Sequence, residues 1–125
     1  MNINKWIALA VLIVVAGGVY FAFFGKNTGD GSQYEAFAKC VTESGAKMYG
    51  TFWCPHCKEQ KRELGKSWQY IDYIECSTPD GKSQTGECRA AGINGYPTWE
   101  FKDGSREEGK LSLTFLSKKT GCPIN

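Results

Sequence analysis

Hydrophobic positions divide the chain into one continuous apolar stretch and several shorter, alternating ones. Residues 6–24 carry no charged side chain, and Lys5 and Lys26 flank them. A helix that crosses a membrane needs about 20 apolar residues, so the pattern predicts a transmembrane anchor within residues 1–25. The alternative is a cleaved signal sequence, whose apolar part is usually about 7–15 residues long. We expect a retained anchor, because aromatic residues rather than a small-x-small cleavage site end the stretch.

A polar linker and a helix follow the apolar stretch. Residues 26–33 are rich in glycine and polar side chains and predict a flexible linker to a domain of residues 34–125. The segment from Ser32 to Glu35 matches a capping box, so a helix should start at Ser32 and stop at Gly45. The apolar side of this helix would consist of Tyr34, Phe37, Ala38 and Val41.

The middle of the chain predicts a strand, a helix and a second strand. Residues 46–53 are rich in aromatic side chains, and residues 70–76 in aromatic and β-branched ones, as buried strands are. Residues 58–63 carry charges of both signs, which is typical of the solvated face of a helix. Pro55 suits the first turn of that helix, where no backbone N–H is needed, and Gly65 should end it.

The last third of the chain continues the alternation. Residues 77–86 predict a polar loop, and residues 87–91 a short helix. Pro97 cannot donate to a central ladder, so it should stand at the start of a third strand. A turn at residues 102–104 would lead into a fourth strand, and Ser112 would cap a final helix. The inner side of that helix would consist of Leu113, Phe115 and Leu116. This order of elements indicates an α/β domain.

Charge and cysteine content narrow the class of protein. The net charge is +2 and no segment carries a dense basic run, so nucleic-acid binding is not expected. Six cysteines in a chain of this size are typical of an oxidising compartment. Lys5 precedes the apolar stretch and, by the positive-inside rule, favours a cytoplasmic N-terminus. The sequence therefore predicts a single-pass protein of the inner cell membrane, with its domain on the periplasmic or extracytoplasmic side.

Two closely spaced cysteines, Cys54 and Cys57, lie where the first predicted strand passes into its helix. The positive end of the helix dipole stabilises a thiolate there. Cys54 would attack a disulfide, and Cys57 would then resolve the mixed disulfide. His56 could add a hydrogen bond or a positive charge beside the sulfur. The residues expected to tune the site are Trp53, Pro55 and His56.

Other uses of a closely spaced cysteine pair fit this sequence less well. A zinc site would need a second close pair, whereas Cys76 and Cys88 are widely separated. A c-type haem site needs histidine directly after the second cysteine, where Lys58 stands. A purely structural disulfide is a further alternative. We therefore expect neither a metal nor a cofactor.

The order of elements and the motifs together resemble the thioredoxin fold. The matching residues are Phe52, Trp53, Cys54, Cys57, Ala91, Gly92, Ile93, Gly95, Pro97 and Thr98, with the turn at residues 102–104. The resemblance implies a central four-stranded mixed sheet flanked by helices. It also implies a cis peptide bond before Pro97, packed against the cysteine pair. Tyr96, Pro97 and Thr98 would then form a substrate-facing loop.

A closer resemblance is to the thioredoxin-like domain of bacterial vitamin K epoxide reductase (VKOR) homologues. It rests on the phrases MYGTFWCPHCKEQK, YIECS and GINGYPTWEFKDG, with Cys40 upstream and Cys122 near the end. In those fusions the domain exchanges disulfides with a quinone-linked membrane reductase and so oxidises exported proteins. The Cys-Pro-His-Cys core also resembles that of DsbA-type oxidants. Here an apparent anchor stands in place of the reductase, so we expect a separate quinone-linked partner of the VKOR or DsbB type.

The four remaining cysteines allow three pairings. The order of elements favours Cys76–Cys88, which would pin the polar loop, and Cys40–Cys122, which would tie the first helix of the domain to the tail. The VKOR resemblance supports the first pair. Free buried thiols are the alternative, because cysteine packs well as a small hydrophobic residue.

One feature of thioredoxins is missing. They carry a buried acid six residues before the first cysteine, and Met48 stands there in this chain. Glu100 or water would then have to accept the proton of Cys57. The alternative is that Glu100 is an outward-facing strand residue.

These observations favour a membrane-anchored thiol–disulfide oxidoreductase that oxidises exported cysteine-containing proteins. A membrane-anchored reductant, of the kind that reduces apocytochromes, would use the same motif at a lower redox potential. A binding or metal-chaperone domain that keeps the fold without the catalysis is a third class.

Overall fold

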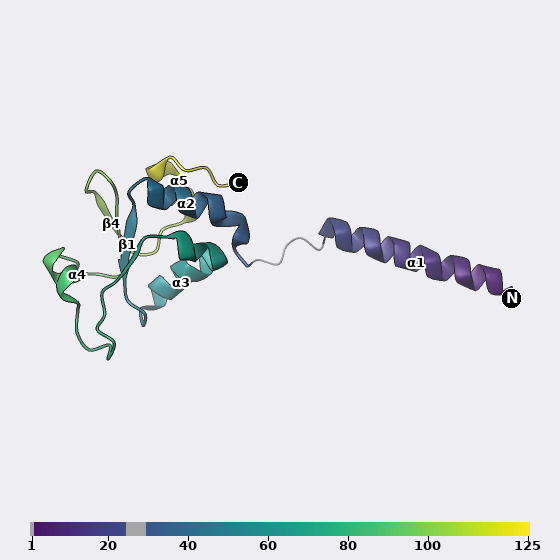
Figure 1. The fold of residues 1–125 in the computed structure, drawn as a ribbon, viewed down its shortest axis with the longest axis horizontal. Coiled ribbons are helices and arrows are strands. Elements are labelled where there is room, and N and C mark those ends of the chain that lie inside the picture. The colour runs from purple at the N-terminus through teal and green to yellow at the C-terminus, as the bar shows by residue number, and fades with distance from the viewer. Residues whose placement is uncertain (1, 25–29) are drawn as a thin grey trace.

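The structure is a computed structural model that describes residues 2–24 and 30–125. Its first element, α1 (Ile3–Phe24), is the apolar helix at the N-terminal end, drawn in purple in Figure 1. By length and composition α1 could cross a membrane, and none of its candidate span is buried within the chain. A signal sequence passes the same test, so the retained anchor stays a prediction. Half of the predicted linker, residues 26–29, lies outside the described residues.

The domain is built on a four-stranded mixed sheet with the strand order β2-β1-β3-β4. The central strand β1 (Lys47–Gly50) runs parallel to β2 (Tyr73–Glu75) and antiparallel to β3 (Thr98–Glu100). The edge strand β4 (Arg106–Glu108) pairs antiparallel with β3. Helices flank this sheet, which confirms the predicted thioredoxin-like α/β fold.

Helices cover both faces of the sheet. Three of them, α2 (Glu35–Glu43), α3 (Pro55–Leu64) and α5 (Leu113–Thr120), lie on one side of β1, and α4 (Gly86–Ala90) lies on the other (Figure 1). Side chains of β1 alternate between the two faces, as those of a strand must. Met48 therefore belongs to the larger core cluster, with α2, α3 and α5, and Tyr49 to a smaller one near α4.

Several predicted boundaries are correct, and the exceptions have local causes. α3 ends at Gly65, which has a positive φ of 53°, and Ser112 caps α5 by accepting a hydrogen bond from Phe115 N. Phe115 itself is 39% exposed, so its predicted inward position is wrong. Leu113 and Leu116 are three residues apart and already form the inner stripe of this two-turn helix.

The capping box predicted at Ser32 is also wrong. A 3₁₀ turn, η1 (Ser32–Tyr34), precedes α2, and no side chain caps that helix. Ser32 instead donates its backbone N–H to Asp30 Oδ1 at 2.9 Å. The prediction failed because an aspartate two residues earlier serves as the acceptor for this turn.

The chain enters the domain by crossing the end of α3. Lys66 N donates to Asp30 O at 2.6 Å, and Ser67 Oγ donates to Gly31 O at 2.5 Å. The crossing is so close that a Cβ added to Gly31 would lie 2.1 Å from Leu64 O. A second 3₁₀ helix, η2 (Gly65–Tyr70), which the sequence did not predict, starts at this crossing. Residues 30 and 31 are therefore held rigidly against the C-terminal end of α3.

Two disulfides connect distant parts of the domain, and they are the pairs that the sequence analysis favoured. Cys40 of α2 is bonded to Cys122 beyond α5, with a Cα–Cα distance of 5.8 Å. Cys76 and Cys88 close the polar loop between β2 and α4, with a Cα–Cα distance of 5.5 Å. A disulfide stabilises mainly by restricting the unfolded chain, and the first pair closes much the longer loop.

Candidate active site

The candidate site is a pair of free thiols at the junction of β1 and α3. Cys54 is the N-cap of α3 and Pro55 occupies its first turn. Cys54 is 6% exposed and Cys57, one helical turn further on, is 0% exposed. Both are unpaired, whereas the other four cysteines form disulfides. The first thiol therefore keeps a small surface exposed to solvent, whereas the second has none.

The loop that leads into β3 faces the first thiol. The Tyr96–Pro97 peptide bond is cis, as the thioredoxin resemblance implied. Cys54 Sγ lies 3.6 Å from Tyr96 O and is placed to donate its S–H to that carbonyl. Thr98 Oγ1 donates to Gly95 O at 2.7 Å, and this bond joins the two ends of the loop. The loop and the thiol pair, which are far apart in sequence, are thus brought together.

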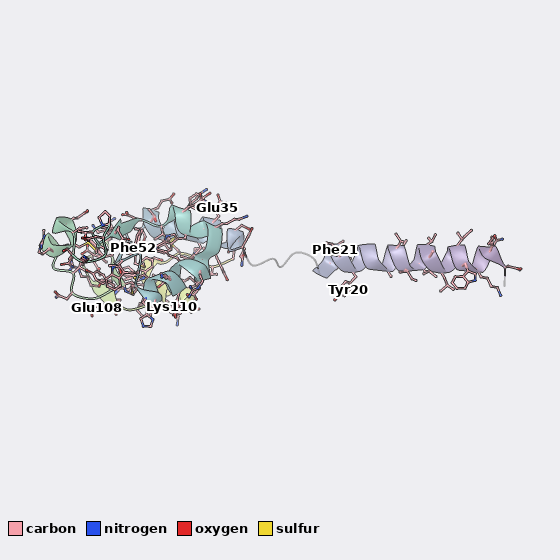
Figure 2. The ribbon with its side chains drawn as sticks, turned by 90° about the horizontal axis from the view of Figure 1, so that it is seen from below. Tyr20, Phe21, Glu35, Phe52, Glu108 and Lys110 are labelled. Atoms are coloured by element: carbon pink, nitrogen blue, oxygen red, sulfur yellow. A yellow bond between two sulfur atoms is a disulfide. The ribbon has the colours of Figure 1, made fainter. Side chains whose placement is uncertain are left out.

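Aromatic side chains surround the site. Phe52, labelled in Figure 2, and Trp53 are each 47% exposed, which is unusual for large apolar residues in a domain of this kind. The Trp53 ring meets the Tyr96 ring edge to face, with 6.0 Å between centroids. These rings give the rim of the site an apolar surface beside Cys54.

Burial determines the ionisation of the second thiol. It raises the pKa of Cys57 to about 12, although a hydrogen bond from the Thr51 backbone opposes this effect. A Cβ on Gly50 would lie 2.9 Å from Cys57 Sγ and 3.3 Å from Met48 Cε. Glycine at position 50 therefore makes room for the sulfur, and the neutral Met48 leaves it without a carboxylate at that position.

Two side chains of β2 near Cys57 were missed by the sequence analysis. The same Cβ on Gly50 would lie 3.0 Å from Tyr73 Cε2, so the Tyr73 ring borders the space that holds Cys57 Sγ. Tyr73 OH donates to Glu75 Oε2 at 2.5 Å, and burial followed by this bond raises the Tyr73 pKa. Lys61 Nζ lies 4.1 Å from the centroid of the Tyr73 ring. The alternation of Tyr73 and Glu75 in the sequence was the only signal for this arrangement.

Glu75 also connects β2 to residues 51–53, the segment that leads from β1 to Cys54. Its Oε1 accepts a hydrogen bond from Phe52 N at 3.0 Å and another from Ser77 N at 3.2 Å. Residues 51–53 have left the strand ladder by this point, which explains why β1 is shorter than predicted. A carboxylate thus replaces the ladder in holding the chain just before Cys54.

Two further candidates from the sequence lie differently. Glu100 is paired with Arg106, at 2.7 Å, and with Lys47, at 3.4 Å, on the sheet surface. It is therefore the outward-facing strand residue, which was the alternative, and the predicted role of Glu100 as proton acceptor for Cys57 is wrong. His56 is two-thirds exposed, and its Nδ1 lies 3.7 Å from Glu59 Oε2. Its expected effect on Cys54 stays a prediction.

The polar loop between β2 and α4 lies beside the aromatic rim of the site. Together with Thr51, Trp53 and Tyr96, residues 76, 77 and 81–84 line an open pocket of about 140 Å³. Trp53 Nε1 donates to Ser77 Oγ at 3.0 Å, and Gln84 Nε2 donates to Tyr96 OH at 2.9 Å. Within residues 2–24 and 30–125, no group of three or more potential ligands is arranged to hold a metal ion.

Comparison with known proteins shows what the chain is similar to. No family model matches the chain. The chain is 41% identical over 95 residues to a curated protein of Arabidopsis thaliana named thiol-disulfide oxidoreductase LTO1. The match covers 72% of this chain but 25% of the relative, so the chain spans about a quarter of that protein's length. Over most of its own length, the chain is thus similar to part of a thiol-disulfide oxidoreductase.

Proposed function

We propose that this chain is a protein thiol–disulfide oxidoreductase whose reacting groups are Cys54 and Cys57. The observation that carries the proposal is the pair itself, with one free thiol on the N-cap residue of a helix and a buried free thiol one turn behind it. The cis-proline loop beside Cys54 and the similarity to a thiol-disulfide oxidoreductase support the same activity.

We propose that the reaction runs as two exchanges when the protein acts as an oxidant. A substrate thiolate attacks Cys54 Sγ of the Cys54–Cys57 disulfide, a substrate–Cys54 bond forms, and Cys57 leaves with the electron pair and is protonated. A second substrate thiolate then attacks the substrate sulfur of the mixed disulfide. The substrate disulfide forms and Cys54 leaves as a thiolate, so two electrons pass from the substrate dithiol to the protein.

The N-terminus of α3 favours this direction. A helix N-terminus stabilises a negative charge beside it by about 0.3–1 kcal/mol, and stabilising the reduced form of a dithiol makes its disulfide a stronger oxidant. The resemblance of the Cys-Pro-His-Cys core to DsbA-type oxidants points the same way. We propose exported cysteine-containing proteins as substrates, and a quinone-linked membrane thiol oxidase of the VKOR or DsbB type as the partner that restores the disulfide.

We propose α1 as the anchor, with the domain on the extracytoplasmic side. The length and apolar composition of α1 support the anchor, and two disulfides in the domain suit an oxidising compartment. A membrane-impermeant thiol reagent should label Cys54 in intact cells after mild reduction. Protection of Cys54 until lysis would contradict this topology.

The redox potential of the Cys54/Cys57 couple tests the direction. The couple should equilibrate with glutathione buffers near the value of about −120 mV typical of DsbA, and a value near −270 mV, typical of thioredoxin, would mean a reductant. The matched control is Cys57→Ser, which keeps the attacking thiol but should accumulate mixed disulfide because nothing resolves it.

A cellular experiment tests whether the domain is catalytic at all. A strain that carries the Cys54→Ser, Cys57→Ser double variant should accumulate reduced exported proteins. If the disulfide content of those proteins stays unchanged, the domain binds without catalysing, and the proposed activity is wrong.

A further inference from the structure

We propose that Ser77 and Gln84 are positioning residues of the thiol site, and that the disulfide-closed loop carrying them orients the aromatic rim around Cys54. The inference rests on the proposed function for its meaning, because it assigns a role within that site. It concerns a loop that reads in the sequence as an ordinary polar connection.

Gln84 holds the tyrosine that faces Cys54. Its Nε2 donates to Tyr96 OH at 2.9 Å and to Ile93 O at 2.7 Å, so both amide hydrogens are used. These two acceptors lie on the segment that leads into the cis-proline loop. A single side chain thereby fixes both the start of that segment and the ring at its end.

Ser77 holds the tryptophan that precedes Cys54. Its Oγ accepts a hydrogen bond from Trp53 Nε1 at 3.0 Å, while its own hydroxyl donates to Thr78 O at 2.9 Å. Ser77 is 6% exposed although its loop is polar. At the tip of the loop, a Cβ on Gly81 would lie 3.7 Å from Trp53 Cδ1, so the loop also packs against this ring.

The loop is built to keep these two residues in register. Ser77 and Gln84 form an isolated antiparallel bridge, so one fixes the position of the other. The Cys76–Cys88 disulfide closes the segment just outside them, and Thr85 N donates to Cys76 O at 2.8 Å. The disulfide therefore acts on the site through the loop as well as on the stability of the domain.

Contacts continue from the loop to the reacting sulfur. The Tyr96 ring that Gln84 holds belongs to the residue whose carbonyl lies 3.6 Å from Cys54 Sγ. The Trp53 ring that Ser77 holds meets this Tyr96 ring edge to face. Releasing either ring should uncover Cys54, which is now 6% exposed, and should disorder the surface against which a substrate must be aligned.

These two consequences have opposite signs and define the experiment. Reduced protein is treated at fixed pH with iodoacetamide, and separately with a model peptide disulfide, and modification at Cys54 is followed by mass spectrometry. In Gln84→Ala, alkylation of Cys54 should become about threefold to tenfold faster and peptide exchange about threefold to tenfold slower, because the two hydrogen bonds from Gln84 to Ile93 O and Tyr96 OH are lost. Ser77→Ala should behave in the same way.

Two further variants make the test specific. Tyr96→Phe removes the hydroxyl that Gln84 holds. The fold-loss of exchange rate in the Gln84→Ala, Tyr96→Phe double variant should therefore be smaller than the product of the two single-variant losses, because both changes break the same hydrogen bond. Ser83→Ala is the matched control, because this exposed serine of the same loop makes its bonds to Thr78 through its backbone oxygen and nitrogen. It should leave both rates unchanged.

The outcomes separate this inference from the proposed function. Rates in Gln84→Ala and Ser77→Ala that match those of Ser83→Ala would overturn the positioning role. A parallel rise of both rates would also overturn it, since general loosening of the domain exposes the thiol to every reagent alike. If the unaltered protein exchanges with no peptide disulfide, the proposed function fails, and the alkylation rates alone decide whether the loop positions the site.

Discussion

The buried position of Cys57 leads to a quantitative prediction about its reactivity. Only a thiolate reacts with an alkylating reagent, so the rate follows the ionised fraction and the accessibility of the sulfur. In the Cys54→Ser variant, with both structural disulfides intact, Cys57 is the single free thiol. The native protein and the unfolded chain can therefore be compared at one sulfur.

The expected magnitude follows from the ionisation of this thiol. Burial raises the pKa of Cys57 from an ordinary 9.0 to about 12. At pH 8 this rise of about three units lowers the ionised fraction about a thousandfold. The serine at position 54 removes the smaller contribution of the neighbouring thiol and leaves burial, the largest cause, in place. Zero exposure of the side chain slows the reaction further.

The assay is a time course of iodoacetamide labelling at pH 8, in buffer and in concentrated guanidinium chloride, without a reducing agent. Labelling of Cys57 in the folded protein should be about a thousandfold slower than in the unfolded chain. Brief global unfolding also exposes Cys57 and sets the slowest labelling rate that can be observed. For a protein stable by about 5 kcal/mol, only about one molecule in several thousand is unfolded, so this route is several thousand times slower than labelling of the unfolded chain. Labelling through global unfolding is therefore too slow to hide the predicted thousandfold difference.

The matched control is Cys57→Ser, in which Cys54 should be labelled in the folded protein much faster than Cys57 is in the first variant. Native labelling of Cys57 within about tenfold of the unfolded rate would refute the reasoning, because a shift of one pKa unit already accounts for a factor of ten. The buried thiol would then lack the protection that a resolving cysteine needs.

Three more predictions concern stability. The protein with Cys54 and Cys57 reduced should lose stability, relative to the protein with these two cysteines oxidised, between about pH 9 and 12. The reason is that the unfolded chain releases the Cys57 proton at a lower pH than the folded protein does. Melting temperatures of the two forms that run parallel across this range would contradict the prediction. Gly31→Ala should lower the free energy of unfolding in urea by at least about 2 kcal/mol more than Gly92→Ala does. Both glycines have a positive φ, but only the Cβ at position 31 would meet a backbone carbonyl. Equal losses would exclude the close crossing. Gln60→Ala should cost about 3 kcal/mol in the same assay, because it leaves Trp99 Nε1 and both backbone groups of Leu111 without partners, and a cost below about 1 kcal/mol would show that water replaces them.

The sequence predicted those parts of the site that depend on local order. Proline after Cys54, the strand before it and the glycine at position 65 were sufficient to place the thiol pair at the start of a helix. The fold followed from the alternation of elements and from the thioredoxin resemblance. Local signals work here because a helix start and a helix end are determined by the residues within one turn.

Contacts set by strand register were beyond the sequence. Tyr73 reaches the space around Cys57 because β2 runs parallel to β1 with Met48 opposite Tyr73. A parallel pair is joined by a long connection, so its register leaves no local trace. The outward direction of Glu100 likewise follows from a register, its pairing with Lys47 in the antiparallel pair of β1 and β3, which are far apart in the sequence.

The loop of Ser77 and Gln84 shows a second kind of limit. Its composition is polar and its turns are ordinary, which correctly indicates a loop but says nothing about what the loop packs against. The Cys76–Cys88 bond was expected, yet its consequence for Trp53 and Tyr96 depends on the three-dimensional path between the two cysteines. Such contacts come from tertiary structure alone.

The crossing at Gly31 limits the distance between the thiol site and the end of α1. The chain is held at the C-terminal end of α3, and Cys54 stands at the other end, about 15 Å away for a ten-residue helix. The five residues between Phe24 and Asp30 can span at most about 20 Å. Cys54 therefore stays within a radius of about 40 Å of Phe24, whichever way the domain turns. A partner fixed beside α1 would meet the thiol at an effective concentration in the millimolar range, so the two could exchange disulfides with little affinity for each other.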